Sequence, residues 1–211
     1  MVEPHLVLAS ASPRRRALLA ELGLPFSVRA VDIDEEHALA TAPSQSPLDL
    51  AMRVAAAKAE ASVRHANEVV LTADTLVMLD GRPLGKPRDA CEAKQMLEAL
   101  RGREHVVVTG VAVVAAAERF VEATEATVTM REYAADEISR YIERGEPFDK
   151  AGAYAIQDTV FAPVASYRGC YCTIVGLPLW CTRRLLRSVG LRPEAPTRAV
   201  CRACPDREEG G

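Results

Sequence analysis

The sequence has few aromatic residues, few lysines and no long apolar stretch. Phe, Trp and Tyr make up 5% of the 211 residues, while 49% are hydrophobic and 26% are charged, a composition that excludes intrinsic disorder for most of the chain. No apolar run approaches the ~20 residues of a membrane-spanning helix, and the first residues lack the basic-then-apolar order of a signal peptide. We therefore expect a soluble, cytoplasmic protein with one medium-sized domain.

An excess of positive charge is also absent. The net charge of −3 argues against a general duplex-binding protein. The basic residues comprise 22 Arg and only 4 Lys. A chain that uses Arg for routine surface charge has a reason to keep Lys where a compact point charge is needed, although a GC-rich genome would produce the same skew.

The six cysteines do not follow the pattern of a disulfide framework, and a reducing compartment would keep them as thiols. Cys201 and Cys204 form a single CxxC motif near the C-terminus. Zinc needs four ligands, and no second CxxC or HxxxH motif accompanies this pair. The sequence therefore favours a domain over residues 1–191 and a loose tail over 192–211, rather than a structural metal site.

Proline, glycine and capping residues divide the chain into alternating strand and helix signals. Ser12-Pro13 and Asp89 are typical of helix starts, and Asp80-Gly81 is typical of a hairpin turn. The predicted strands cover 5–9, 26–31, 68–73, 76–79, 106–115, 120–130, 160–166 and 171–175. The predicted helices cover 12–22, 48–65, 90–100, 136–144 and 178–189. Interleaved helices and strands with antiparallel ribbons predict an α/β fold with a mixed sheet.

The first candidate site is the segment Ser10-Ala-Ser12-Pro13-Arg14-Arg15-Arg16, between the first predicted strand and helix. A helix N-terminus offers free backbone N–H groups and about half a positive charge, so it attracts anions before any side chain is counted. Three arginines in the first turn oppose the helix dipole unless an anion binds, and Ser hydroxyls and Arg guanidinium groups hold phosphate oxygens well. The alternative is a capped helix whose arginines face solvent.

Carboxylates form the second candidate site. An acidic run over 32–36, which includes Glu35, follows the second predicted strand, and Asp74 follows the apolar run 69–71. Acidic runs are usually solvated loops, but a buried carboxylate at Asp74 would need a partner, which makes it a candidate metal ligand or general base. Carboxylates beside a polyphosphate also need a divalent cation between them, and Mg²⁺ prefers one or two carboxylates with waters and phosphate oxygens.

Lysines and one glutamine form the third candidate site. Lys86 lies in an extended Gly-Lys-Pro segment, Lys58 lies on an Ala-rich helix, and Lys150 begins a segment of small residues that ends at Gln157. Single lysines usually face solvent. A Gln side chain, however, both donates and accepts hydrogen bonds as a nucleobase edge requires, and small residues let a flat ligand approach the backbone. The alternative for this segment is a tightly packed strand crossing.

Six motifs follow one another along the chain: Leu8-Ala-Ser10-Ala-Ser12-Pro13-Arg14-Arg15, Ala73-Asp74-Thr75, Gly85-Lys86-Pro87, Gly102-Arg-Glu-His105, Asp149-Lys150-Ala151-Gly152-Ala153-Tyr154-Ala155-Ile156-Gln157 and Val175-Gly176-Leu177-Pro178. Over residues 6–190 they resemble the ordered motifs of the Maf family of nucleoside triphosphate pyrophosphatases. The resemblance implies a Maf/inosine-triphosphatase-like α/β fold, in which a long twisted mixed sheet spans two lobes with a central cleft. It also implies cleavage of the α–β phosphate bond, with a divalent metal cation (Mg²⁺ or Mn²⁺) as cofactor.

The resemblance assigns roles by position. Asp74 matches the proton acceptor and Glu35 the carboxylate after the second strand, so both would also hold the metal; Lys86 is counted with the catalytic residues and the phosphate ligands. The remaining substrate-binding positions are matched by Ser10, Arg14, Arg15, Lys58, Thr75 and Gln157. Thr75 after the Asp, and the Tyr-x-Ile-Gln ending, resemble the branch that acts on dTTP and UTP rather than the 7-methyl-GTP branch.

Departures from the family pattern lie beside the expected base pocket. Residues 158–160 stand in place of a Gly-rich stretch, Ala155 in place of Gly, and Cys170 and Cys172 in place of polar residues. Two other functions stay open: a purine triphosphate pyrophosphatase of the inosine type, and a nucleotide-sensing regulator of septum formation. We expect a nucleoside triphosphate as the binding partner, no nucleic acid and no membrane, with a homodimer as one alternative for the oligomeric state.

Overall fold

A computed structural model describes residues 4–31, 33, 46–62, 65, 67–116 and 118–207. Its centre is a seven-stranded sheet with the order β2-β1-β3-β5-β6-β7, to which β4 adds beside β3. The strands are β1 (His5–Leu8), β2 (Phe26–Val28), β3 (Glu68–Leu79), β4 (Arg82–Leu84), β5 (Glu104–Ala115), β6 (Glu118–Met130) and β7 (Val164–Gly169). Strand β1 pairs in parallel with β2 and β3, and the other pairings are antiparallel, which confirms the predicted α/β fold with a mixed sheet.

The helices are α1 (Pro13–Ala20), α3 (Pro47–Ala61), α4 (Ala90–Leu100), α5 (Ala135–Glu143), α6 (Tyr171–Val175), α7 (Leu179–Ser188) and α8 (Ala199–Arg202), with short 3₁₀ turns η1 (Glu146–Asp149) and η2 (Ala151–Ala153). Capping explains several boundaries. The Ser12 and Asp89 side chains accept hydrogen bonds from the first turns of α1 and α4, as the sequence predicts. Helix α3 lies close against β5, where a Cβ on Gly110 would come within 2.2 Å of the Ala51 carbonyl oxygen.

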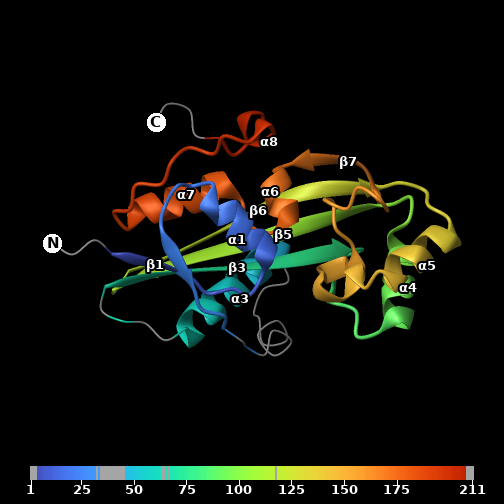
Figure 1. The fold of residues 1–211 in the computed structure, drawn as a ribbon, viewed down its shortest axis with the longest axis horizontal. Coiled ribbons are helices and arrows are strands. Elements are labelled where there is room, and N and C mark those ends of the chain that lie inside the picture. Colours follow the sequence, from blue (N-terminus) through green and yellow to red (C-terminus); the bar gives the residue numbers. More distant parts are fainter. Residues whose placement is uncertain are drawn as a thin grey trace.

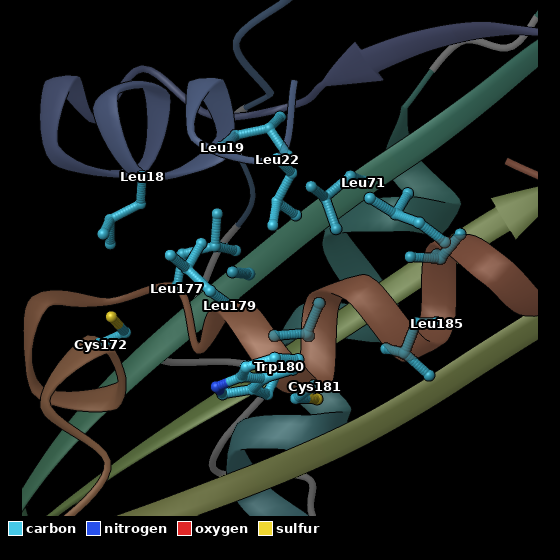
Figure 2. Close-up of a cluster of buried hydrophobic side chains, with 14 of the residues drawn as sticks. Leu18, Leu19, Leu22, Leu71, Cys172, Leu177, Leu179, Trp180, Cys181 and Leu185 are labelled. Atoms are coloured by element: carbon cyan, nitrogen blue, oxygen red, sulfur yellow. The ribbon is translucent and has the colours of Figure 1, made fainter. Parts of the chain in front are cut away.

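Two main hydrophobic cores lie toward opposite ends of the long sheet, α1 and α7 covering one end and α4 and α5 the other (Figure 1). The first core packs leucines of α1 and α7 onto β1 and β3 (Figure 2). Its members include Leu18, Leu71 and Leu185, which are at most 2% exposed. The second core joins α4 and α5 to the far halves of β3, β5 and β6. Residues in the middle of the sheet, between the two cores, are therefore held in place by packing at both ends.

Strand β3 is one continuous strand, and the predicted break at Asp74-Thr75 is wrong. The residue pairs Thr72–Ala112 to Leu76–Val108 continue the β3–β5 ladder through both positions. The polar residues do not interrupt the strand because each finds a polar partner: Lys58 for Asp74, and Thr109 and Arg15 for Thr75. Asp74 therefore lies in the middle of a central strand and not at its end.

Two further expectations differ from the structure. Residues 171–175, predicted as a strand, form helix α6, which Gly176 ends with a φ of +117°. The expected loose tail is packed as far as residue 207. Cys201 is 2% exposed, and its carbonyl oxygen accepts a hydrogen bond from Nε1 of Trp180 at 2.9 Å. The apolar thiols and this buried indole explain why a segment without hydrophobic periodicity is ordered. In the part of the chain that the structure describes, no helix has the length and apolar character needed to cross a membrane.

Candidate active site

Arg15 is held at the N-terminus of α1 by three kinds of acceptor. Its Nε donates to the Gly176 carbonyl oxygen at 2.9 Å, one terminal nitrogen to Thr75 Oγ1 at 3.1 Å, and the other to Ser10 Oγ at 3.4 Å. Ser10 lies two residues after β1 and is 8% exposed. The contacts with Thr75 and Gly176 join α1 to β3 and to the end of α6. The guanidinium group is therefore oriented before any anion binds.

Gly176 allows this close approach. Its φ of +117° is a conformation that side chains disfavour, and a Cβ there would lie 3.2 Å from Thr75 Oγ1 and 3.6 Å from Arg15 Nε. Thr75 in turn exchanges a hydrogen bond with Thr109 at 3.0 Å, and Thr109 donates to the Thr173 carbonyl oxygen of α6 at 2.7 Å. A chain of hydroxyl groups thus connects β3, β5 and α6 beneath Arg15.

Asp74 forms a buried ion pair with Lys58 of α3. The Lys58 Nζ lies 2.6 Å from Asp74 Oδ1, and the two side chains are 9% and 6% exposed. Breaking such a pair leaves one uncompensated charge in a poorly solvated place. With Oδ1 engaged, Oδ2 is the oxygen that can accept a proton or bind a cation.

Asp74 and Thr75 are neighbours on β3, and successive side chains of a strand point to opposite faces. Asp74 faces α3, as Thr72 does through its 2.6 Å hydrogen bond to the Ala55 carbonyl oxygen. Thr75 faces the side of α1, as Leu71 does in the first core. The structure therefore joins Ser10, Arg15 and Thr75 on one face, and Lys58 and Asp74 on the other.

The edge of β3 connects these two groups. Pairing with β1 ends at Leu8–Leu71, and pairing with β4 begins at Val77–Leu84. Within the described residues, no strand pairs with this edge of β3 between Thr72 and Leu76. One ligand at the unpaired edge could contact side chains from both faces.

A pocket of about 380 Å³ opens beside Arg14. It is lined by Arg14, Arg144, Glu146, Lys150, Ala155, Gln157, Asp158, Thr159 and Val160. Two of the predicted substrate-binding residues, Arg14 and Gln157, thus share one pocket, and Gln157 is exposed to it. Because Arg14 is next to Arg15 in the chain, the pocket adjoins the α1 face of the site.

Asp149 bridges two cations at the rim of this pocket. It lies 2.9 Å from Arg14 and 2.6 Å from Lys150 Nζ. Burial alone would raise the pKa of Asp149, but hydrogen bonds and charge from Lys150 and Arg14 outweigh burial, so the pKa lies below its ordinary value of 3.8. The carboxylate is therefore ionised at neutral pH and partly neutralises both cations.

Lys86 is exposed, and no described residue forms an ion pair with it. Its neighbour Gly85 accepts a hydrogen bond from the Gly152 N–H at 3.0 Å, which brings the Gly85-Lys86-Pro87 motif next to the segment after Lys150. Glu35, the other predicted catalytic residue and metal ligand, lies outside the described residues.

Several residues of the site have roles that the sequence did not suggest. Asp149 holds Arg14, Thr109 supports Thr75, and the Gly176 carbonyl oxygen orients Arg15. Asp149 and Gly176 lie within the quoted motifs, but nothing in the sequence assigns them these contacts. Lys150, which the sequence places at the start of the segment that ends at Gln157, also lines the pocket.

The donor atoms fit a hard divalent cation. Asp74 offers a carboxylate oxygen that Lys58 does not hold, and Mg²⁺ or Mn²⁺ takes such oxygens together with phosphate oxygens and water.

The fold and the site together define a mixed α/β protein that presents arginines and a buried aspartate at the open edge of a central strand. The chain belongs to the Maf-like protein family, whose match covers residues 5–189. The dTTP/UTP pyrophosphatase of Thermomicrobium roseum is 49% identical over 205 residues, which cover 95% of this chain and 93% of the relative. The dTTP/UTP pyrophosphatase of Symbiobacterium thermophilum is 47% identical over 187 residues, which cover 88% and 94%.

Among solved structures, a HAM1 protein from Coxiella burnetii matches with a TM-score of 0.43 and 18% identity. The match covers 62% of this chain and 73% of that protein.

Proposed function

We propose that this protein hydrolyses dTTP and UTP to the nucleoside monophosphate and pyrophosphate. The observation that carries the proposal is the similarity over nearly the full length to relatives named dTTP/UTP pyrophosphatase. The site supports it, because arginines at a helix N-terminus and a buried aspartate are groups that triphosphate hydrolysis can use. The role is removal of these nucleotides from the cytoplasmic pool.

The phosphates bind where positive charge gathers. Arg15 and Ser10 contact them at the N-terminus of α1, and Arg14 and Lys86 add charge from the pocket side. Arg15 is already oriented by Thr75 and Gly176, so little conformational entropy is lost when the ligand binds. Arg14 exchanges the Asp149 carboxylate for a phosphate oxygen.

Asp74 acts as the general base. A water molecule attacks the α-phosphorus, the bond to the bridging oxygen breaks, pyrophosphate leaves, and Asp74 Oδ2 takes the proton from the water. Lys58 holds Oδ1 and so fixes the direction of the second oxygen. General-base catalysis typically contributes about 10²–10⁴-fold, and much of the remaining rate comes from positioning and charge stabilisation.

Glu35 would hold the divalent cation directly and Asp74 would hold it through a water molecule, which leaves Asp74 Oδ2 available to accept a proton. When bound, such a cation neutralises charge on the phosphate oxygens and lowers the pKa of a coordinated water.

The base occupies the pocket beside Arg14. Gln157 hydrogen-bonds the pyrimidine edge, and the small Ala155 leaves room for a flat ring. Uracil and thymine differ by one methyl group, which such a pocket discriminates by only about 1–3 kcal/mol. Acceptance of both pyrimidines follows.

The test is pyrophosphate release from each common and modified nucleoside triphosphate, with and without EDTA. We expect turnover of dTTP and UTP that depends on a divalent cation. A strong preference for a purine triphosphate such as ITP would contradict the substrate class. Binding of dTTP without pyrophosphate release would contradict the reaction and favour a regulatory role.

A further inference from the structure

Four of the six cysteines meet in one buried cluster formed by two distant segments. Cys170 and Cys172 lie at the start of α6, and Cys201 and Cys204 lie in and just after α8. The four side chains are between 1% and 7% exposed. None of them belongs to the proposed active site.

The sulfur atoms form two close pairs. The Sγ atoms of Cys172 and Cys201 are 3.5 Å apart, and those of Cys170 and Cys204 are within 4.8 Å. Cys170 and Cys172 are separated by one residue at the start of α6, so the two pairs adjoin each other.

The separation of Cys172 and Cys201 is close to that of two ligands in a tetrahedral thiolate site. With Zn–S bonds of about 2.3 Å, two sulfur ligands of one zinc ion lie about 3.8 Å apart. A disulfide bond would need about 2.0 Å, which is much shorter than the 3.5 Å between Cys172 and Cys201. The two closely spaced pairs, C-x-C and C-x-x-C, together supply the four sulfur ligands that a structural zinc ion needs.

We propose that Cys170, Cys172, Cys201 and Cys204 bind one structural zinc ion. Each thiol loses its proton as the ion binds, and no oxidation or reduction is involved. All four coordination positions are filled by protein, so this ion has no open position for a substrate. The site differs from the proposed catalytic cation site in ligand chemistry, since thiolates select zinc and carboxylates select magnesium or manganese.

Asp206 adds a carboxylate beside the cluster. One of its oxygens lies within 4.8 Å of the Cys170 and Cys204 sulfurs, and its Oδ2 is buried without a hydrogen-bond partner among the described residues. The carboxylate is therefore an oxygen donor next to the thiols, of a kind that zinc also accepts as a ligand.

The zinc ion would attach the C-terminal segment to the body of the domain. Besides the cysteines, α8 is held by the hydrogen bond from Trp180 to Cys201 and by the ion pair between Arg198 and Glu21. Helix α6 begins at the cluster and ends at Gly176, whose carbonyl oxygen orients Arg15. The ion therefore fixes the helix that supports the phosphate-binding arginine.

The experiment measures the metal content of untagged protein purified under reducing conditions without chelators. We expect about one zinc ion per chain, and Co²⁺ reconstitution should give the thiolate-to-cobalt and ligand-field bands of a tetrahedral cysteine site. Absence of zinc, together with no such bands on adding Co²⁺, would overturn the proposal. A Cys172–Cys201 disulfide in the freshly purified protein would overturn it as well.

Cys→Ser variants test which residues bind the zinc ion. Cys204→Ser and Cys172→Ser should each lose most of the zinc, while Cys91→Ser, on exposed α4, and Cys181→Ser, buried in the same core outside the cluster, should keep it. Zinc that persists in Cys204→Ser and Cys172→Ser alike would contradict the assignment. If these variants do not fold, the intensity of the cobalt bands in the unmodified protein still gives the number of thiolate ligands. Asp74→Asn should also keep the zinc, so the result does not depend on the proposed hydrolysis.

Discussion

Two ion pairs of the site have the same chemistry but very different surroundings. Lys58 and Asp74 lie 2.6 Å apart between α3 and β3, with side chains 9% and 6% exposed. Arg14 and Asp149 lie 2.9 Å apart at the rim of the pocket, with side chains 28% and 59% exposed. A ligand can replace Asp149 as the partner of Arg14, whereas Lys58 and Asp74 are held together by the protein around them.

The difference separates two tasks. A buried pair is costly to break, so it keeps a carboxylate in one orientation, as a general base requires. An exposed pair contributes about 0–1 kcal/mol and exchanges readily, as a substrate-binding cation requires. The site therefore combines a rigid side at α3 with an exchangeable side at α1.

Breaking the rigid pair should have the largest effect. Asp74→Asn should lower kcat at least ~10²-fold because it removes the proton acceptor. It should also lower the free energy of unfolding by about 3 kcal/mol, since Lys58 stays buried without its counter-charge. Steady-state pyrophosphate release and urea unfolding measure the two effects.

The double variant Lys58→Met/Asp74→Asn separates stability from catalysis. Replacing a buried ion pair by apolar residues is often neutral, and the Met/Asn pair leaves no buried charge, so the double variant should regain part of the lost stability and stay inactive. Recovery of activity together with stability would mean that Asp74 acts only through the fold.

Loss of the Arg15 guanidinium group should have the second-largest effect. Arg15→Lys keeps the charge but cannot bind Ser10, Thr75 and the Gly176 carbonyl oxygen at once. Loss of one charged hydrogen bond to phosphate, worth about 1.5–3 kcal/mol, should lower kcat/KM roughly 10- to 100-fold. Arg16→Lys, an exposed neighbour on α1, is the matched control and should leave kcat/KM unchanged.

Gly176→Ala tests whether the support of Arg15 matters. The positive φ and the 3.2 Å approach to Thr75 should cost about 1–3 kcal/mol of stability and displace the guanidinium group. A raised KM for dTTP is expected along with the lower Tm. Gly190→Ala, whose φ is also positive but whose Cβ position is open, provides the control for backbone strain alone.

A substitution in the exposed Arg14–Asp149 pair should have the smallest effect. Asp149→Asn should change the free energy of unfolding by less than about 1 kcal/mol and should lower KM, because one carboxylate no longer competes with phosphate for Arg14. The Asp149 pKa is lowered in the folded protein, so its contribution is present above its ordinary value of 3.8 and is lost as the pH falls through the lowered pKa. The free energies of unfolding of the unmodified protein and of Asp149→Asn should therefore differ at pH 7 and converge in strong acid. Unfolding curves of both proteins, measured at each pH, would detect this.

The sequence predicted best what is decided locally. Ser12-Pro13 set the start of α1, and Asp89 set the start of α4, because caps act within one turn. Residues 171–175 are β-branched enough to predict a strand, yet core packing and the turn at Gly176 make them a helix. Here tertiary structure overrode a short-range preference.

Contacts between distant segments could not be predicted. The sequence indicates that Asp74 needs a partner, but only the packing of α3 on β3 shows that the partner is Lys58. In the same way, Cys201 and Cys204 looked like an incomplete motif because their neighbours in space lie about thirty residues earlier in the chain. A single C-x-C motif inside an apolar segment carries no signal by itself.

A crystal structure of Asp74→Asn with dTTP and Mg²⁺ tests the central claim most directly, because residue 74 and Arg15 lie on opposite faces of β3. The account predicts that the β- and γ-phosphates contact Arg15 and Ser10, that the base lies near Gln157, and that the α-phosphate sits at the unpaired edge of β3 within reach of residue 74. A nucleotide held wholly on the α1 face, with the β3 backbone between its α-phosphate and residue 74, would contradict it.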